Sequence, residues 1–558
     1  MSLVEVSDLT ISFDGAAGVR AVDGVSFTLE AGAALGVVGE SGSGKSASAY
    51  ALLGLHRGTG TTVGGSIRVA GVDVQTANDA ELRALRGAKA AMVFQDPLSS
   101  LDPYYAVGDQ IAEVYRVHTR ASRRAARARA VEVLDRVGIP DAARRSRSRP
   151  HEFSGGMRQR ALIAMALACE PQLLIADEPT TALDVTVQAQ ILDLLHHLRQ
   201  ETGMGLLLVT HDVGVAAESV DDVLVMQAGR EVESGPVADV FGAPRRPYTR
   251  ELLSAVPRVD VKRVVPAAAP DVKDAVPIPE TRGAGDGEPL LEAVGLRREF
   301  GRGSGRLIAV DGVSLTVHRG ETLGIVGESG SGKTTLGRML VRLLDPTGGR
   351  LHYGGAEIGS LSDKALRPYR RELQMVFQDP VASLNPRRSI GESVADPLRA
   401  AGVLDDTRIR SRVRELLERV GLDPDRYDRY PHEFSGGQRQ RVGIARALAA
   451  DPKLIVCDEP VSALDVTTQA QVTALLAELQ RELGLGLVFI AHDLAVVRQV
   501  SDRVAVMRQG RIVEQGSVDE VYGAPQDPYT KQLLAAVPAL DPALATVRRA
   551  ARKELAVV

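Results

Sequence analysis

Two glycine-rich segments, GESGSGKS and GESGSGKT, each end in a lysine followed by a hydroxyl residue. Glycines let backbone N–H groups converge on phosphate oxygens, and a helix that begins there adds positive potential. The spacing predicts that Lys45 and Lys333 hold the β- and γ-phosphates of ATP. The hydroxyls of Ser46 and Thr334 are predicted to coordinate Mg²⁺. The other loop residues predicted to contact the nucleotide are Gly39, Ser41, Gly42, Ser43, Gly44, Ala47, Gly327, Ser329, Gly330, Ser331, Gly332 and Thr335.

Downstream of each glycine loop, an apolar segment ends in an Asp–Glu pair. LLIA precedes Asp177 and Glu178, and the second copy, LIVC, precedes Asp458 and Glu459. A lone pair of this kind is weak evidence, since acidic residues often cap helices. Behind a phosphate loop, the pair predicts that the first carboxylate reaches Mg²⁺ and that the second polarises the attacking water as a general base. The predicted chemistry is ATP hydrolysis at two sites.

A histidine follows each Asp–Glu pair at the end of a further apolar segment. His211 lies in LLLVTHD and His492 in LVFIAHD, each 33 residues after the glutamate of its pair. An isolated histidine at a strand end is usually structural. Because both copies keep one spacing, we expect each histidine to contact the γ-phosphate and to hold the water and the glutamate in line.

Short buried strands and helices must position these groups. AALGVVG leads into the first glycine loop and SASAYALLGL continues from it with a helical pattern. QLLIADE and GLLLVTH are apolar runs typical of buried parallel strands. Between Gln95 and Ser154 the pattern becomes helical and rich in arginine, which predicts a helical subdomain inserted into an α/β core.

The chain repeats itself at a long, fixed offset. HEFSGGMRQRALIAMALA begins at His151 and recurs as HEFSGGQRQRVGIARALA at His432, 281 residues later. PYTRELLSAVP recurs as PYTKQLLAAVP at the same offset, whereas the glycine loops are 288 residues apart. So long a period excludes a short-repeat solenoid and predicts two homologous domains.

The predicted domains cover residues 1–260 and 288–540. Between them, 261–287 is rich in Pro, Ala and charge without periodicity, which predicts an extended linker. The tail, 541–558, has a basic amphipathic pattern. We expect a solvated terminal helix there rather than a membrane anchor.

Composition limits the classes of function. The 558 residues are 44% hydrophobic and 25% charged, as in soluble globular proteins, and a net charge of −4 gives no basic field for nucleic acid. The two cysteines, Cys169 and Cys457, form no CxxC pair, which excludes a four-thiolate cluster and fits a reducing cytosolic setting. We find no signal peptide pattern and no apolar stretch near about 18 residues, so we expect no bilayer span.

Further motifs carry a family resemblance. FSGG at 153–156 and 434–437 resembles the signature of ATP-binding-cassette (ABC) ATPases, and ALD after each Asp–Glu pair resembles their D-loop. MVFQDP resembles the Q-loop, so Gln95 and Gln378 are expected to sense Mg²⁺ and to face a transmembrane partner. The resemblance covers nearly the whole chain apart from the linker and tail. It adds to the predicted nucleotide sites the residues Phe13 and Phe300 (adenine stacking), Gln95, Gln378, Ser154, Gly155, Gly156, Ser435, Gly436, Gly437 and Gln438.

The resemblance implies an α/β fold with two P-loop nucleotide-binding domains. Each is expected to have a RecA-like α/β core, a helical subdomain and an antiparallel β subdomain. The family's architecture also implies that the domains act head to tail. One ATP is then expected between Lys45 and Ser435, and another between Lys333 and Ser154. The linker raises the effective concentration of the second half, and closing and opening on ATP supplies a mechanical stroke.

Two finer motifs narrow the resemblance. SLDP or SLNP after the Q-loop and the closing PYT..LL..VP are similar to the peptide/nickel importer group. This implies a fused energy-coupling subunit at the cytoplasmic face of the membrane, with two transmembrane permease subunits and an extracytoplasmic substrate-binding protein as partners. The alternative is a soluble tandem ABC ATPase acting on ribosomes or DNA, which the short linker, the acidic charge and the lack of zinc-finger cysteines disfavour. The cargo stays open among dipeptide, longer peptide, nickel chelate and glutathione.

The two halves differ at two motif positions. Met157 stands where Gln438 completes the second signature, and Ala47 stands where the second loop has Thr335. Neither change removes a phosphate-binding lysine, a metal ligand or a general base. We therefore expect hydrolysis at both sites, with slower turnover at the site that uses the atypical first signature.

Overall fold

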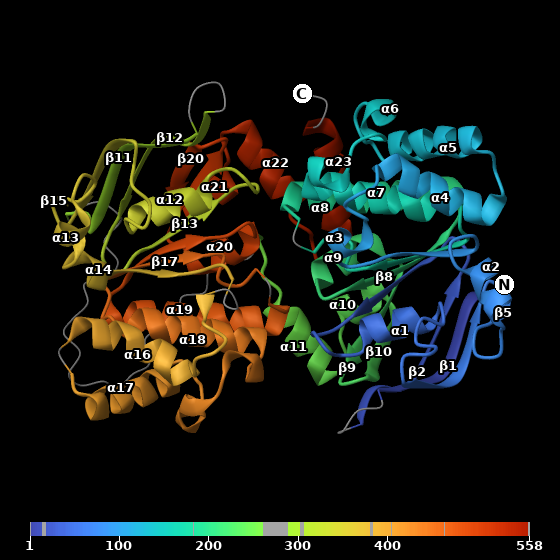
Figure 1. Ribbon diagram of the computed structural model, residues 1–558, viewed down its shortest axis with the longest axis horizontal. Helices are drawn as coiled ribbons and strands as arrows, with labels where there is room; N and C mark the ends of the chain where they lie inside the picture. Colours follow the sequence, from blue (N-terminus) through green and yellow to red (C-terminus); the bar gives the residue numbers. More distant parts are fainter. Residues whose placement is uncertain are drawn as a thin grey trace. The chain divides into compact units, whose positions relative to one another are not determined.

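The computed structural model describes residues 2–13, 18–181, 183–260, 288–301, 306–379, 383–402, 404–462 and 464–555. The chain forms two compact units, one of Met1–Val256, Asp465–Thr467 and Pro538–Val558 and the other of Pro257–Leu464 and Thr468–Val537. Blue to green marks the first 256 residues in Figure 1, and yellow to red marks the second half. The predicted linker, 261–287, lies outside the described residues.

The residues that the structure describes form ten strands in each half. In the first they are β1 (Ser2–Phe13), β2 (Val19–Glu30), β3 (Ala34–Val38), β4 (Thr61–Val69), β5 (Val72–Asp73), β6 (Ala90–Val93), β7 (Leu173–Asp177), β8 (Gly205–Thr210), β9 (Asp222–Gln227) and β10 (Arg230–Pro236) among the described residues. In the described part of the second half they are β11 (Leu291–Phe300), β12 (Leu307–Val317), β13 (Thr322–Val326), β14 (Gly348–Tyr353), β15 (Ala356–Glu357), β16 (Leu373–Val376), β17 (Leu454–Asp458), β18 (Gly486–Ile490), β19 (Arg503–Arg508) and β20 (Arg511–Ser517).

Helices alternate with these strands. The described residues up to 256 include α1 (Lys45–Ala51), α2 (Asp79–Leu85), α3 (Pro97–Ser100), α4 (Val107–Thr119), α5 (Arg123–Arg136), α6 (Ala142–Arg145), α7 (Gly155–Leu167), α8 (Val185–Thr202), α9 (Val213–Ser219), α10 (Val237–Gly242) and α11 (Pro247–Ala255). The second half includes α12 (Lys333–Leu340), α13 (Asp363–Leu366), α14 (Tyr369–Glu372), α16 (Ile390–Ala401), α17 (Asp406–Arg419), α18 (Gly436–Leu448), α19 (Val466–Leu483), α20 (Leu494–Val500), α21 (Val518–Gly523) and α22 (Pro528–Ala536). The last helix is α23 (Pro542–Leu555).

The larger sheet of the first unit is built around β3. Its strand order is β10-β9-β3-β8-β7-β6, in which β10 is antiparallel to β9 and the other neighbours are parallel. Every residue of β3, β7 and β8 is buried. Strands covered on both faces need apolar residues at every position, which explains why these segments lack alternation. The second unit repeats the arrangement as β16-β17-β18-β13-β19-β20.

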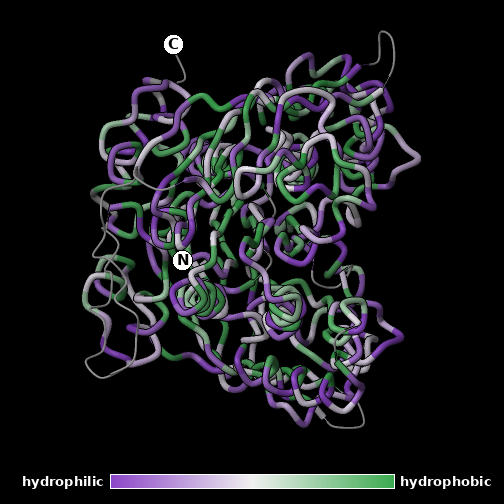
Figure 2. The backbone as a smooth tube through the Cα atoms, turned by 90° about the vertical axis from the view of Figure 1, so that its left-hand side faces the viewer, coloured by the Kyte–Doolittle hydropathy of each residue, from purple (hydrophilic) through white to green (hydrophobic). Residues whose placement is uncertain are grey.

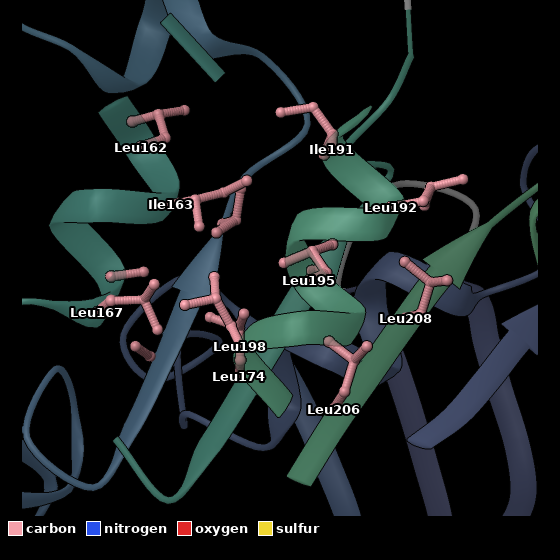
Figure 3. Close-up of a cluster of buried hydrophobic side chains, with 14 of the residues drawn as sticks. Leu162, Ile163, Leu167, Leu174, Ile191, Leu192, Leu195, Leu198, Leu206 and Leu208 are labelled. Atoms are coloured by element: carbon pink, nitrogen blue, oxygen red, sulfur yellow. The ribbon is translucent and has the colours of Figure 1, made fainter. Parts of the chain in front are cut away.

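In the first unit, aliphatic side chains fill the space between α7, α8 and the larger sheet (Figure 3). Ile163 comes from α7, Leu195 and Leu198 from α8, and Leu206 and Leu208 from β8, and each is at most 2% exposed. Their spacing along α8 turns one face of the helix to the sheet. Burying a leucine or isoleucine side chain contributes roughly 1.5–3 kcal/mol, so this layer fixes α7 and α8 against the strands that carry the site residues.

Two further layers complete each unit. In the first unit, β2-β1-β4-β5 form an antiparallel sheet, and α4 and α5 pack together and against α7. In the second, the corresponding elements are β12-β11-β14-β15 and the helices α16, α17 and α18. The predicted fold class, with two α/β domains that each carry a helical and an antiparallel β subdomain, is confirmed.

The tail helix α23 differs from the solvated helix predicted from its pattern. In the first unit, Arg552 donates to Asp193 over 3.1 Å and to Glu218 over 3.0 Å, and its side chain is 11% exposed. Arg549 lies 3.2 Å from Asp193. The amphipathic pattern identified the helix, but it did not reveal its acidic partners, the half-buried Asp193 on α8 and the buried Glu218 on α9. This face of α23 is therefore packed and ion-paired rather than solvated.

Hydrophilic and hydrophobic residues are interleaved along the backbone (Figure 2). Among the residues that the structure describes, no helix has both the length and the apolar character needed to cross a bilayer.

Candidate active site

The carboxyl ends of the parallel strands bring the predicted motifs to one edge of each large sheet. In the first unit, Gly39 follows β3, His211 follows β8, Asp177 ends β7, and Gln95 comes two residues after β6. These strands are neighbours in the sheet, so residues that are far apart in the chain meet at its edge. The same strand relationships recur in the second unit through β13, β18, β17 and β16.

Glycines in the first phosphate loop are required by the path of the backbone. Gly39 has φ of 154°, and a Cβ added there would lie 2.2 Å from the carbonyl oxygen of Met226. Gly44 has φ of 96°, and its Cβ would lie 2.4 Å from the carbonyl oxygen of Ala21. Both the conformation and the close backbone contacts therefore exclude a side chain at these positions. Gly44 is the N-cap of α1, so the helix begins directly at the end of the loop, with Lys45 as its first residue.

The loop lysines are held by backbone carbonyl groups. Lys45 Nζ donates to the carbonyl oxygens of Gly39 and Glu40 over 2.8 and 2.7 Å, and Lys333 makes the equivalent bonds over 2.7 and 2.9 Å. Each lysine is 5% exposed. Burial lowers the pKa of Lys45, and the negative charge of Glu178 partly opposes this effect. The ammonium group of each lysine is therefore held inside its own loop by two backbone carbonyl oxygens.

A hydroxyl and a buried carboxylate meet beside each lysine. Ser46 Oγ donates to Asp177 Oδ1 over 3.0 Å, and Thr334 Oγ1 donates to Asp458 Oδ1 over 2.9 Å. Asp177 is fully buried, and its Oδ2 has no hydrogen-bond partner among the described residues. Burial raises the pKa of Asp177. A hydroxyl, one carboxylate and phosphate oxygens are the hard oxygen donors that Mg²⁺ prefers, so these residues fit the ion.

Glu178 is the centre of a polar cluster. Gln95 Nε2 donates to its Oε2 over 2.7 Å, Thr181 Oγ1 donates to the same oxygen over 3.0 Å, and His211 Nδ1 lies 3.0 Å from its Oε1. The side chain of Glu178 is 12% exposed, whereas that of His211 is 31% exposed. The glutamate is thus fixed by three donors from different segments, and the histidine still reaches the surface of the site.

Glu178 and His211 each favour the charged form of the other. Burial acts to raise the pKa of Glu178, but the hydrogen bond and charge of His211 outweigh it and hold the pKa below its usual value. Burial acts to lower the pKa of His211, and Glu178 reverses that effect, so the pKa of the imidazole is raised. An ionised glutamate beside a proton-carrying imidazole can accept a proton from water while the histidine faces a phosphate.

The second unit repeats this geometry. Gln378 Nε2 donates to Glu459 Oε2 over 2.8 Å, and His492 Nδ1 lies 3.4 Å from the same carboxylate oxygen. The pKa of Glu459 is again lowered against the effect of burial, through His492. Both units therefore assemble a glutamine, a glutamate and a histidine from separate strand ends.

Both glutamates have a left-handed backbone that their sequence context did not reveal. Glu178 has φ of 46° and Glu459 has φ of 45°, and their N–H groups donate to the carbonyl oxygens of Val209 and Ile490 over 2.8 and 2.9 Å. Positive φ is uncommon for a residue with a side chain and costs of order 1–3 kcal/mol. The turn aims the carboxylate at the neighbouring histidine instead of continuing the strand.

Sequence reasoning missed several residues at the site. Thr181 bonds Glu178, and it lies three residues after it in a turn. Tyr50 lies one helical turn after Ser46, and its pKa is raised to about 12 by burial and by the charge of Asp177. The i, i+4 spacing from Ser46 was a usable signal for Tyr50. Tyr248 of the closing PYT motif bonds to Glu40 of the phosphate loop, and no local sequence signal indicated this contact.

The signature serines begin helices. Ser154 is the N-cap of α7 and its side chain accepts from Met157 N, while Ser435 is the N-cap of α18 and accepts from Gln438 N. In the second unit Gln438 Oε1 also accepts from Ser435 N over 3.0 Å, which completes a capping box. The glycines that follow lie in the first turn of each helix, and Ser154, Gly155, Ser435 and Gly436 are exposed.

The predicted adenine-stacking aromatics lie at the ends of β1 and β11. Phe13 is 41% exposed, and its ring meets that of His56 edge to face at 5.9 Å. Phe300 is 36% exposed, with the guanidinium of Arg298 at 4.8 Å from its ring centre. The D-loop alanines, Ala182 and Ala463, lie outside the described residues.

Comparison with known proteins places the chain in a family. Residues 22–181 and 310–462 match the family described as ABC transporter, and residues 232–285 and 513–557 match the oligopeptide/dipeptide transporter C-terminal region. The chain is 48% identical over 563 residues to the glutathione import ATP-binding protein GsiA of Escherichia coli (strain K12), covering 97% of this chain and 90% of that protein. The GsiA of Salmonella choleraesuis (strain SC-B67) is 48% identical over 570 residues, with 98% and 91% covered.

One similar solved structure is the dimeric post-hydrolysis state of the ATP-binding cassette MJ0796 bound to ADP and Pi. It is 31% identical, covers 41% of this chain and 98% of its own, and has a TM-score of 0.39.

The chain is thus a tandem P-loop ATPase, and it belongs to the ABC transporter family. More closely, it is an ATP-binding subunit of the peptide-type importers, with two cassettes in one chain and the C-terminal region of the oligopeptide/dipeptide group after each.

Proposed function

We propose that both cassettes hydrolyse ATP, with Glu178 and Glu459 as general bases and His211 and His492 as the groups that face the γ-phosphate. The observation that carries this proposal is the duplicated Gln–Glu–His cluster, with Gln-to-Glu bonds of 2.7 and 2.8 Å in the two units. Positioned general bases contribute about 10²–10⁴-fold to a rate.

Mg²⁺ accompanies each ATP. Ser46 and Asp177 hold the ion in the first site, and Thr334 and Asp458 hold it in the second. The ion would supply charge neutralisation on the phosphates. Gln95 and Gln378, which bond to Glu178 and Glu459, would respond to its presence. The hydroxyl–carboxylate bonds of 3.0 and 2.9 Å support this assignment because they bring two oxygen donors to one point.

Each ATP is completed by the signature of the other cassette. The phosphates held by Lys45 are capped by the helix that begins at Ser435, and those held by Lys333 by the helix that begins at Ser154. A helix N-terminus offers unpaired N–H donors and positive potential to an anion, and the exposure of both serines supports this role. Nucleotide then joins the two cassettes, and hydrolysis releases them.

The partners are two transmembrane permease subunits and an extracytoplasmic substrate-binding protein, which place this subunit peripherally at the cytoplasmic face of the membrane. In the first unit a pocket of about 470 Å³ opens beside the Q-loop, lined mainly by apolar residues such as Met92, Phe94 and Leu162. Phe94 directly precedes Gln95 and is 39% exposed. A permease helix seated there would move Gln95, and with it Glu178, which couples transport to hydrolysis.

The cargo is glutathione or another short peptide. Support comes from the relatives named glutathione import ATP-binding proteins, which align over nearly the whole chain. Nothing in the comparisons favours the alternative on ribosomes or DNA.

Uptake assays test this proposal. Proteoliposomes would carry the full chain with its permeases and binding protein, and labelled glutathione, a dipeptide and a nickel chelate would be offered with MgATP inside. ATP-dependent uptake of glutathione or a dipeptide is expected, and the double variant Glu178→Gln/Glu459→Gln should abolish it. Sedimentation of the chain with ribosomes, without co-purification of permeases, would contradict the proposal.

A further inference from the structure

The closing PYT motif of each half reaches back to the phosphate loop of its own unit. Tyr248 is at the second position of α11, and the backbone N–H of Glu40 donates to its hydroxyl over 3.4 Å. Tyr529 is at the second position of α22, and Glu328 N–H donates to its hydroxyl over 3.0 Å. Both tyrosines are buried, at 8% and 2% exposure. The contact occurs in both units, between loop and PYT segments that are repeats of each other.

The loop residue that bonds to the tyrosine hydroxyl also accepts a hydrogen bond from the loop lysine. Lys45 Nζ donates to the carbonyl oxygen of Glu40, whose N–H donates to Tyr248. Lys333 and Tyr529 are joined in the same way through Glu328. One loop residue therefore connects each tyrosine hydroxyl to the ammonium group expected to bind the phosphates.

Neighbouring groups fix the tyrosine in place. Proline at the first position of α11 sets the start of the helix, since its missing N–H needs no partner there. Just before it, the carboxylate of Glu233 on β10 accepts from the N–H groups of Arg245 and Arg246 over 2.9 and 3.2 Å. Glu514 on β20 accepts in the same way from Gln526 and Asp527 over 2.8 and 3.1 Å. The tyrosine thus projects from a segment pinned to the antiparallel end of the large sheet.

These tyrosines lie outside the residues matched as ABC transporter and inside those matched as the C-terminal region. The ABC transporter match ends at residues 181 and 462, whereas the tyrosines lie in the matches to the C-terminal region of oligopeptide/dipeptide transporters, which begin at 232 and 513. The C-terminal region therefore contributes a contact to the nucleotide site that the cassette motifs do not contain.

We propose that Tyr248 and Tyr529 are positioning residues for the phosphate loop: by accepting the second N–H of the loop, each hydroxyl fixes the peptide on which the phosphate-binding lysine rests. This inference rests on the proposed ATP sites and adds to them. A loop that is pre-formed loses less conformational freedom when it binds nucleotide, so the hydroxyl strengthens ATP binding. It touches no reacting atom, so it leaves the chemical step nearly unchanged.

The test uses tyrosine-to-phenylalanine variants of the full chain, because only the hydroxyl is removed. The Kd for MgATP would be measured in a Glu178→Gln/Glu459→Gln background, where binding is separated from hydrolysis. Tyr529→Phe is expected to weaken binding at one of the two sites by about 10-fold, and Tyr248→Phe by less, since its bond is longer. In the chain with both glutamates, KM should rise while kcat stays within about twofold.

Tyr522→Phe is the matched control. The hydroxyl of Tyr522 is also buried, and it donates to the carbonyl oxygen of Leu494 over 2.7 Å rather than accepting from a phosphate-loop residue. This variant is expected to lower the melting temperature without changing the Kd. If Tyr529→Phe and Tyr248→Phe behave like Tyr522→Phe, the tyrosines are structural and the inference is wrong. Because binding is measured without turnover, this result would leave the proposed catalytic roles of the glutamates to be judged separately.

Discussion

Gln95 and Glu178 are joined by a 2.7 Å hydrogen bond, although they lie 83 residues apart in the chain. The glutamine follows β6 and the glutamate follows β7, and these strands are parallel neighbours. The segment expected to sense the permease is therefore bonded to the proposed general base. Movement of the glutamine changes the surroundings of the carboxylate with no intermediate residue.

A nearly isosteric change of Gln95 tests this contact. Gln95→Glu places a second carboxylate against Glu178, and like charges raise the pKa of a carboxyl group. The base must be ionised to act, so the acid limb of the ATP turnover–pH profile should move to higher pH. Gln95→Met removes a donor to the ionised carboxylate without adding charge, so it should move the limb upward by less than Gln95→Glu does. Equal profiles for Gln95→Glu and wild type would show that the two side chains do not meet in the working enzyme.

An alanine variant is usually more stable than a glycine variant at the same position. The left-handed backbone of Glu178 predicts the opposite order of stability there. Alanine is strained at φ of 46°, whereas glycine is not. Glu178→Gly should therefore be more stable than Glu178→Ala by about 1 kcal/mol, and both should be inactive at this site. Chemical denaturation of the two variants measures the difference. A more stable alanine variant would mean that the turn is not left-handed.

Exchanging Met157 and Gln438 between the two signatures tests whether this position makes ATP turnover at the two sites unequal. Met157→Gln should complete the capping box of α7, stabilise that helix by about 1 kcal/mol, and raise turnover at the site that uses Ser154. Gln438→Met removes the bond to Ser435 N and should do the opposite at the other site. Single-turnover hydrolysis in backgrounds with one glutamate replaced separates the two sites. If neither Met157→Gln nor Gln438→Met changes the rate of ATP hydrolysis, the capping box does not cause unequal turnover.

The tail helix predicts a pH-dependent stability. Arg552→Ala leaves Glu218, which is 8% exposed, without its guanidinium partner and should destabilise the first unit by about 3–5 kcal/mol. Burial raises the pKa of Glu218, so the folded chain binds a proton more readily than the unfolded chain, and stability falls as pH rises through that range.

Lowering the pH should therefore recover part of the stability lost in Arg552→Ala, as followed by denaturant unfolding between about pH 5 and 8. The double variant Arg552→Ala/Glu218→Gln should lose most of this added pH dependence. The change Ala550→Glu, at an exposed position of the same helix, makes the net charge of α23 more negative by one, as Arg552→Ala does, and serves as the control for net charge. A stability of Arg552→Ala equal to wild type would contradict the ion pair.

Much of the site was predictable because its chemistry depends on local motifs. The glycine loop, the Asp–Glu pair and the histidine each follow an apolar strand, and repetition at fixed spacing distinguished them from chance. The α/β core followed from the same alternation of apolar strands and helices, whereas the antiparallel β subdomain was implied by the family resemblance. These signals are contained within about ten neighbouring residues each.

Contacts between distant segments were not predictable. The bond between Tyr248 and Glu40 joins residues 208 apart, and no periodicity relates them. The left-handed Glu178 bonds through its N–H to Val209 on β8, 31 residues further along the chain. Likewise, the basic pattern of the tail gave its helix, but Asp193 and Glu218 had no signature as its partners. Tertiary packing decides such features, so they emerge only once the elements are placed.

We propose that Glu178 and Glu459 serve two ATP sites that work as a pair. Steady-state ATP turnover of the full chain with its permeases would be measured for Glu178→Gln and Glu459→Gln separately. Paired sites predict that each single variant falls below about one tenth of the wild-type turnover, since neither half completes a cycle alone. If either variant keeps half or more of the wild-type turnover, the sites act independently and the account is contradicted.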